Sequence, residues 1–171
     1  MEHTDNIDRA WMMAHIPHQG DMCLLDHVAS WDAQRMSAIA TSHLDANNPL
    51  RAHDRLGAAN GIEYAAQAMA VHTALLATSQ TGTSALTERP KAGFLASVRN
   101  ANLHVACLDD IDEPMQIEVV LTHSEPNCIL YQFTLSGQRT QTPLLDGRAT
   151  VILDASLVEQ KHSDNLKGNA S

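Results

Sequence analysis

Residues 61–77 read GIEYAAQAMAVHTALLA and form the longest helical pattern in the chain. Strong helix formers make up most of this stretch, and it carries no charged side chain after Glu63. A helix that is apolar on almost every side is one that other parts of the chain cover. Its many alanines let neighbouring backbone approach closely. The stretch therefore predicts one long, buried helix at the centre of the domain.

The sequence on both sides of this helix alternates between apolar and polar residues, as β-strands do. We predict strands within residues 22–31, 36–43, 94–106, 115–122, 129–135 and 148–153. An apolar turn leads into the first of them. The later connections are short, which favours antiparallel pairing. We therefore predict an α+β fold, a curved antiparallel sheet wrapped around one long central helix. Such a sheet exposes an edge strand, which pairing in a dimer would cover.

The composition is that of one globular domain. The chain has 171 residues, of which 44% are hydrophobic and 18% charged. We expect a folded domain over residues 15–155, an N-terminal lead over 1–14 and a polar tail over 156–171. The net charge of −9 and an aromatic content of only 4% argue against nucleic-acid binding.

The sequence also indicates where the protein works. No segment is long and apolar enough to span a membrane, and the first residues lack the basic and apolar regions of a secretory signal. Cys23, Cys107 and Cys128 are scattered without paired spacing, which is typical of reduced thiols. We therefore expect a cytoplasmic protein.

Basic residues concentrate in the middle of this acidic chain. Residues 51–99 hold three acidic residues and five basic ones. The basic residues are Arg51, Arg55, Arg89, Lys91 and Arg99. They could form a face that docks an acidic partner, or they could be ordinary solvated surface.

Two segments resemble a known enzyme family. Residues 16–28 begin Ile16-Pro17-His18 and continue to a Leu-Leu-Asp-His-Val run, similar to the opening Leu-Pro-His and Leu-Leu-Asp-Arg-Val of β-hydroxyacyl-carrier-protein dehydratases. Residues 61–68 resemble the helix start of these enzymes, where Ala-Gln follows a Glu, and 47–49 resemble their Asn-Glu-Pro. Over about residues 15–154 the chain looks like a hotdog-fold dehydratase, closest to those of aryl-polyene-type clusters.

The resemblance implies a set of site residues. Glu63 would be the catalytic acid, although burial favours its protonated form and the helix N-terminus favours its anion. Gln67 would hold Glu63 or a solvent molecule, or would only satisfy buried backbone. Gly61 could donate its N–H to a thioester oxygen, or be structural. Gly93-Phe94-Leu95 matches the strand that lines the acyl tunnel in the family.

The catalytic base is the point where the chain departs from the family. The dehydratases carry their catalytic His within Gly-His-Phe-Pro-Gly, fourteen residues before the Glu, and here that position is Pro49. His53 is the only histidine in this loop, and His18 is the other candidate. Either one could be the base, or the chain supplies none.

The other histidines do not form a recognisable metal site. His15 and His18 are three residues apart, but no carboxylate or cysteine joins them at ligand spacing, so no metal is expected. His72 follows Glu63 by nine residues, which places it on the opposite face of the helix.

Three functions remain open from the sequence. The first is a dehydratase that needs no cofactor and acts on a 3-hydroxyacyl thioester carried on the phosphopantetheine arm of an acyl carrier protein. The second is a non-catalytic hotdog subunit that binds acyl chains or stabilises a catalytic partner. The third is an acyl thioesterase. All are compatible with a homodimer or with a heterodimer of two hotdog chains.

Overall fold

The computed structural model describes residues 6–81 and 93–153, in which one long helix lies against a six-stranded sheet. The two α-helices are α1 (Arg9–His15) and α2 (Gly61–Thr81). The strands are β1 (His27–Trp31), β2 (Arg35–Ala40), β3 (Phe94–Leu103), β4 (Met115–Glu125), β5 (Cys128–Gly137) and β6 (Pro143–Ile152). Short 3₁₀ turns lie at Gly20–Met22, Ser42–Leu44 and Ala58–Asn60.

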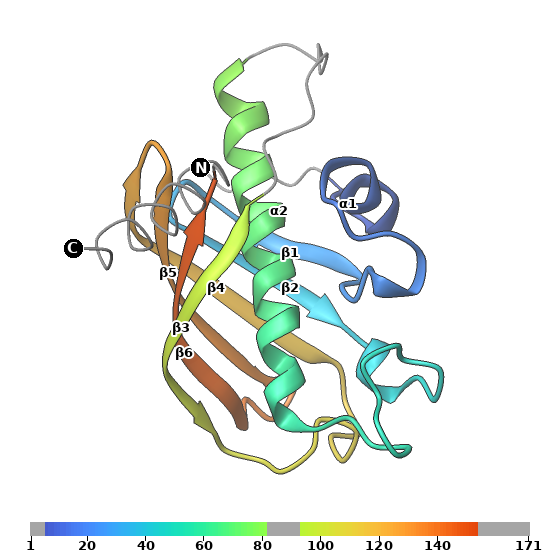
Figure 1. The fold of residues 1–171 in the computed structure, drawn as a ribbon. Coiled ribbons are helices and arrows are strands. Elements are labelled where there is room, and N and C mark those ends of the chain that lie inside the picture. Colours follow the sequence, from blue (N-terminus) through green and yellow to red (C-terminus); the bar gives the residue numbers. More distant parts are fainter. Residues whose placement is uncertain (1–5, 82–92, 154–171) are drawn as a thin grey trace, which may run out of the picture.

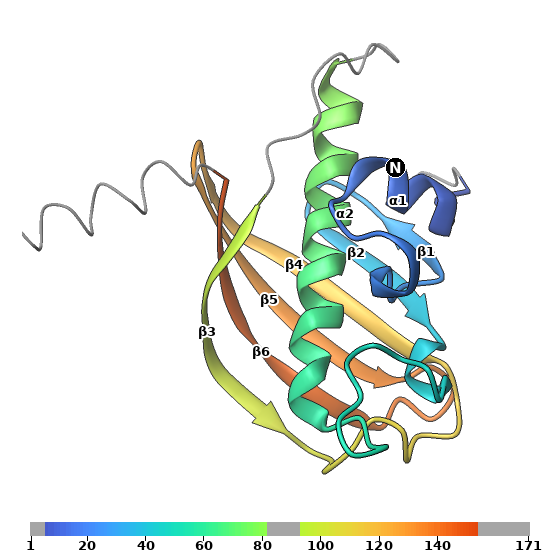
Figure 2. The ribbon, with the colours of Figure 1, turned by 45° about the vertical axis from the view of Figure 1, so that its right-hand side comes forward.

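The strands form one antiparallel sheet in the order β1-β2-β4-β5-β6-β3. The sheet curves around α2, and α1 lies beside the helix near β1 (Figure 1). Figure 2 shows β3 at one edge of the sheet, opposite the edge formed by β1. The predicted α+β architecture is confirmed.

Several predicted boundaries shift in the structure. Helix α2 continues to Thr81, and β2 ends at Ala40, because Ser42–Leu44 form a 3₁₀ turn in place of the predicted strand end. The N-terminal lead is not separate from the domain, since Ile7 and Met12 are buried in the core. The packed domain therefore begins before residue 15. The predicted tail, 156–171, lies outside the described residues.

The start of α2 packs tightly on the sheet at Gly61. A Cβ at this position would stand 2.7 Å from a methyl of Leu145 and 3.0 Å from one of Leu135. Glycine therefore allows the first turn of the helix to lie directly on β5 and β6, and this contact fixes where the residues of the next turns point.

Two histidines are fully buried in this core. The ring nitrogens of His72 lie 3.0 Å from the hydroxyl of Tyr131 and 2.8 Å from the carbonyl oxygen of Asp32. His43 lies 3.1 Å from the carbonyl oxygen of Ile111. Burial lowers the pKa of both imidazoles, because the charged form loses its hydration.

These two histidines predict a loss of stability in mild acid. Their folded-state pKa lies below the unfolded value of 6.5, so the unfolded chain binds more protons as the pH falls below that value. The free energy of unfolding should then drop by up to about 1.4 kcal/mol per pH unit for each histidine. Urea titrations at a series of pH values measure this slope. His72→Gln should reduce it and His27→Gln, on an exposed side chain, should not; equal slopes in all three proteins would contradict the assignment.

Candidate active site

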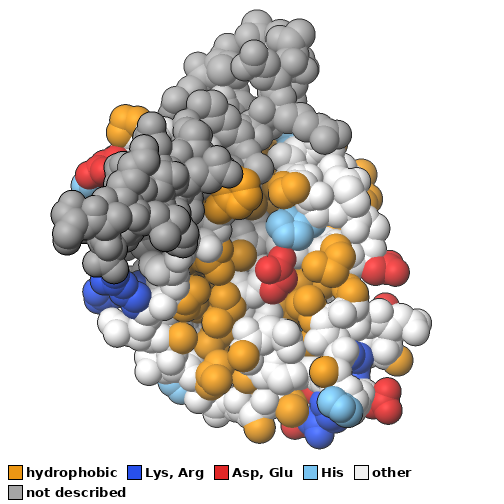
Figure 3. Space-filling model, in the orientation of Figure 1, with side chains coloured by type: hydrophobic (Ala, Val, Ile, Leu, Met, Phe, Trp, Pro, Cys, Tyr) orange, Lys and Arg blue, Asp and Glu red, His pale blue; other side chains and the backbone are white. Residues whose placement is uncertain are grey.

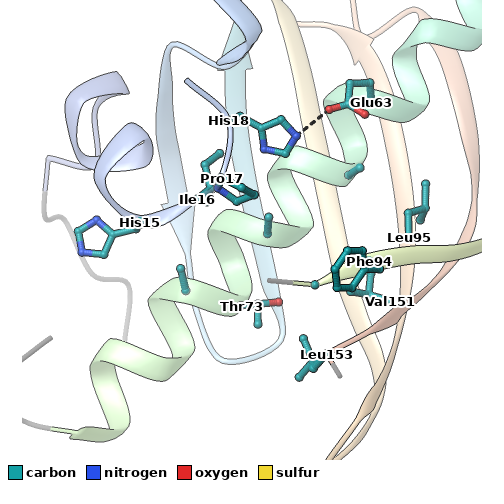
Figure 4. A pocket seen from close by; sticks show the side chains of 14 residues that line it. His15, Ile16, Pro17, His18, Glu63, Thr73, Phe94, Leu95, Val151 and Leu153 are labelled. Carbon is teal, nitrogen blue, oxygen red and sulfur yellow. Dashed lines mark ion pairs between the residues drawn. The ribbon is translucent and has the colours of Figure 1, made fainter. Parts of the chain in front are cut away.

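His18 and Glu63 form a pair beside α2. His18 Nε2 lies 3.0 Å from Glu63 Oε1. His18 comes from the loop after α1, where Pro17 restricts the backbone, and Glu63 comes from the first turn of α2 (Figure 4). Their side chains remain 24% and 33% exposed, so both can be reached from outside. One chain thus joins two of the three residues predicted for catalysis.

Gln67 holds this pair in place. One turn along α2 from Glu63, its Nε2 donates to Glu63 Oε1 over 3.0 Å and to the carbonyl oxygen of Met22 over 2.8 Å. Its Oε1 accepts the N–H of Leu24 at 2.8 Å. Gln67 is fully buried, so both roles considered from the sequence apply: it satisfies buried backbone and positions Glu63.

Glu63 is the anionic member of the pair. The hydrogen bond from His18 lowers the pKa of its carboxyl; burial opposes this, and the Gln67 hydrogen bond adds to the lowering. His18 Nδ1 is buried and has no hydrogen-bond partner among the described residues. Nε2 is therefore the ring nitrogen through which His18 contacts the Glu63 carboxylate.

The pair stands in a groove of about 860 Å³, part of it open to solvent. One wall is a single face of α2, because the residues that line it recur at helical spacing: Glu63, Ala66, Ala70, Thr73 and Ala74. The opposite wall comes from the start of β3 and the end of β6. Figure 3 shows apolar side chains gathered on this face, with an acidic and a histidine side chain beside them. The groove can hold an apolar chain with a carboxylate beside it.

The strand predicted to line an acyl tunnel does line this groove. Gly93, Phe94 and Leu95 belong to its wall. Phe94 is 49% exposed and Leu95 40% exposed, which leaves an apolar surface on the edge strand β3. Within residues 6–81 and 93–153, β3 is an edge strand of the sheet, so the groove is bounded on one side by an edge at which another strand could pair.

The structure gives Gly61 a different role from the predicted one. Its N–H donates to the carbonyl oxygens of Ala58 and Ala59, so it is not free for a thioester oxygen. Gly61 is buried against the sheet and does not line the groove. The structural alternative considered from the sequence is the one that holds.

His53 does not join the site within one chain. It is exposed at the tip of the turn between Ala52 and Arg55, with a φ of 52°, and is not among the residues that line the groove. The left-handed backbone at His53 and Asp54 matches a tight two-residue turn. His18 is therefore the histidine that contacts Glu63.

The predicted basic face is divided in the structure. Arg51 and Arg55 lie 3.4 and 2.9 Å from Asp109, and Arg55 also contacts Asp110 at 2.7 Å. Their charges are thus offset within the chain. Arg99 stands apart from them on β3, while Arg89 and Lys91 lie outside the described residues.

Several residues of the groove wall were not predicted from the sequence. The spacing of Ala66, Ala70 and Ala74 from Glu63 is a helical pattern that could have identified this wall. Val151 at the end of β6 and Leu153 just after it also line the groove, and β6 lies beside β3 only through a non-sequential pairing. No local signal in the sequence marks them.

Neither a metal site nor a membrane-spanning helix is found among the described residues. Within residues 6–81 and 93–153, no group of three or more His, Cys, Asp or Glu side chains is placed to hold a metal ion. No helix in the same described ranges is long and apolar enough to cross a membrane.

Comparison with known proteins places the chain in a family. The family model for ApeP-like proteins, described as the ApeP dehydratase, matches residues 12–160. The chain belongs to the ApeP-like dehydratase family. The resemblance seen in the sequence is confirmed by this match, whereas a search of curated proteins gave no match to this ApeP-like chain.

Solved structures confirm the hotdog fold of the ApeP-like chain. The dehydratase heterocomplex ApeI:P from Xenorhabdus doucetiae matches with a TM-score of 0.72 and 17% identity, over 87% of this chain and 95% of that one. The PaaI protein of E. coli, from a phenylacetic acid degradation operon, has a TM-score of 0.53 and 12% identity over 73% and 80% of the two chains. A variant of the thioesterase SAV0944 from Staphylococcus aureus gives 0.50 and 11% over 73% and 89%.

Proposed function

We propose that this ApeP-like chain removes water from a 3-hydroxyacyl thioester carried on the phosphopantetheine arm of an acyl carrier protein, in fatty-acid or polyene-type lipid synthesis. The observation that carries the proposal is the Glu63 carboxylate, held by His18 and Gln67 at an apolar groove. An elimination next to a thioester needs a base for the C2 proton and an acid for the departing hydroxyl.

One carboxylate can perform both proton transfers. Glu63 Oε1 is occupied by His18 and Gln67, which leaves Oε2 for the substrate. Glu63 takes the C2 proton on Oε2, the electrons of that C–H bond form the C2–C3 double bond, and the C3–O bond breaks. Glu63, now a carboxylic acid, gives its proton to the leaving hydroxide. Water forms and the carboxylate is restored, so the cycle consumes no cofactor.

His18 acts here as a positioning residue. Its Nε2–H fixes Oε1, and its buried Nδ1 is out of reach of the substrate. The charge-assisted hydrogen bond also keeps Glu63 ionised between turnovers. This assigns the base to Glu63, and leaves His53 without a role in the same chain.

A second hotdog chain is part of the proposal. Phe94, Leu95 and Leu103 on the edge strand β3 are 49%, 40% and 53% exposed, and an apolar edge favours pairing with another strand. One of the similar folds reported above, with a TM-score of 0.72, is that of a heterocomplex. A partner across β3 would close the groove, which also supports the second candidate function: a subunit whose own groove binds the acyl chain while the partner supplies the catalytic histidine.

Mass spectrometry of a 3-hydroxyacyl carrier protein tests the proposed function. The carrier is incubated with the purified chain alone and with a second hotdog subunit. Loss of one water in either mixture, with no loss when the partner is tested alone, supports a dehydratase that includes this chain. Release of the free acid would assign a thioesterase instead. An unchanged carrier in every mixture would overturn the proposed reaction.

A further inference from the structure

Two arginines face each other on the sheet surface that points away from α2. Arg99 on β3 and Arg148 on β6 are direct partners across the strand pair, and both are exposed. Arg148 alternates along β6 with the buried Ala149, which places its side chain on the outer face. Like charges directly opposite each other in a sheet are destabilising unless an anion lies between them.

Within the described part of the chain, neither arginine has an acidic partner at ion-pair distance. Asp146, two residues before Arg148 on β6, is already engaged: its carboxylate accepts from Asn102 at 2.8 Å and lies 2.6 Å from His104 Nε2. This contrasts with Arg51 and Arg55, which Asp109 and Asp110 neutralise. In a chain with a net charge of −9, Arg99 and Arg148 form a local cationic pair.

The pair lines a hollow with further hydrogen-bonding groups. Thr122, Gln132 and Thr150 share its wall with the two arginines. Two guanidinium groups, the Thr150 hydroxyl and the Gln132 amide can donate to carboxylate oxygens, whereas the Thr122 hydroxyl already donates to the carbonyl oxygen of Leu130 over 3.1 Å. We call these five residues the arginine hollow.

The arginine hollow and the groove share the same two strands on opposite faces. Val151, which lines the groove, follows Arg148 by three residues, about 10 Å along the strand. The wall of the groove includes the start of β3 and the end of β6. A partner held at the arginine hollow would therefore sit close to this part of the groove.

We infer that the arginine hollow docks an acidic surface of the acyl carrier protein whose substrate the groove receives. The identity of the partner rests on the proposed function. The position of the docking site rests on charge complementarity. The arginine hollow replaces the basic face predicted from the sequence. Among the described members of that face, Arg51 and Arg55 are paired with acidic side chains and Arg99 is not. Carboxylates of the carrier would lie between the two guanidinium groups and relieve their repulsion.

Binding of holo acyl carrier protein, measured by isothermal titration calorimetry, tests the docking surface. We expect Arg99→Glu combined with Arg148→Glu to raise the Kd at least tenfold. Arg35→Glu is the matched control, because Arg35 is exposed on β2 and its charge is reversed in the same way; its Kd should stay within about twofold of the wild type. Circular dichroism and size-exclusion chromatography check folding and oligomeric state.

The result also separates docking from chemistry. The ratio of kcat/KM for the carrier-bound substrate to that for a 3-hydroxyacyl pantetheine thioester should fall at least tenfold in the double variant. Carrier binding that depends on both arginines, in a chain that dehydrates neither substrate, would support the docking surface and overturn only the proposed reaction. An unchanged Kd, or a double variant whose oligomeric state changes, would overturn the docking surface.

Discussion

Glu63→Gln should abolish dehydration of a 3-hydroxyacyl carrier protein, with a loss of about 10³-fold or more in the single-turnover rate. The amide keeps the size of the side chain and an oxygen that can accept from His18, so the groove and its walls are retained. What disappears is the group that takes the C2 proton and returns it to the leaving hydroxide. The rate is measured by mass spectrometry as the loss of water over time.

Glu125→Gln is the matched control for this variant. Glu125 is 63% exposed at the end of β4, so the same chemical change there should leave the rate within about twofold of the wild type. Glu63→Gln should also bind the carrier-linked substrate as tightly as the wild type does. Full activity of a complex that contains the Glu63→Gln chain would assign catalysis to the partner and make this chain the non-catalytic subunit.

His18→Gln separates positioning from direct catalysis at the same site. A glutamine amide can still donate to Glu63, so a positioning role predicts a moderate loss and a shift in the pH profile. The hydrogen bond from His18 lowers the pKa of Glu63, and a weaker donor should let that pKa rise. The acid limb of the rate profile should then move to higher pH, whereas a purely structural residue would leave the limb in place.

The sequence was informative where the signal is local. The helix of residues 61–77 and the alternating strands follow from apolar periodicity, and Glu63 with Gln67 follows from a spacing of one helical turn. The sequence could identify His18 as a candidate, but it could not show that His18 contacts Glu63. That contact depends on how the loop after α1 packs on α2. That packing is set by Gln67, which reaches 45 residues back to Met22.

The predictions for Gly61 and for the basic face were wrong because they depend on tertiary contacts. Gly61 looked available for a substrate oxygen, but a preceding 3₁₀ turn uses its N–H and the leucines of β5 and β6 require its missing side chain. Arg51 and Arg55 looked like free cations, but a distant segment brings Asp109 to both. The leucines and Asp109 are far in the sequence from the residues that they contact, so composition and spacing could not reveal these contacts.

Ala70→Phe should shorten the groove and restrict the chain length of the substrate. Ala70 lies two helical turns from Glu63, about 10 Å along the axis, and its methyl group lines the wall. An aromatic ring at this position would occupy the space that the distal part of a long acyl chain needs. We expect kcat/KM for a 3-hydroxydodecanoyl carrier protein to fall about 100-fold or more, while a 3-hydroxybutyryl carrier protein loses only a few-fold.

Ala33→Phe is the corresponding control, because Ala33 is exposed in the turn between β1 and β2 and is not part of the groove wall. It adds the same ring and should leave the preference for chain length unchanged. If Ala70→Phe slows both substrates equally while its melting temperature is preserved, the acyl chain does not run along this face of α2. A selective loss of activity on the long substrate would instead show that small side chains along α2 set the length of acyl chain on which Glu63 can act. The alanine-rich composition of the helix would then be explained by its function.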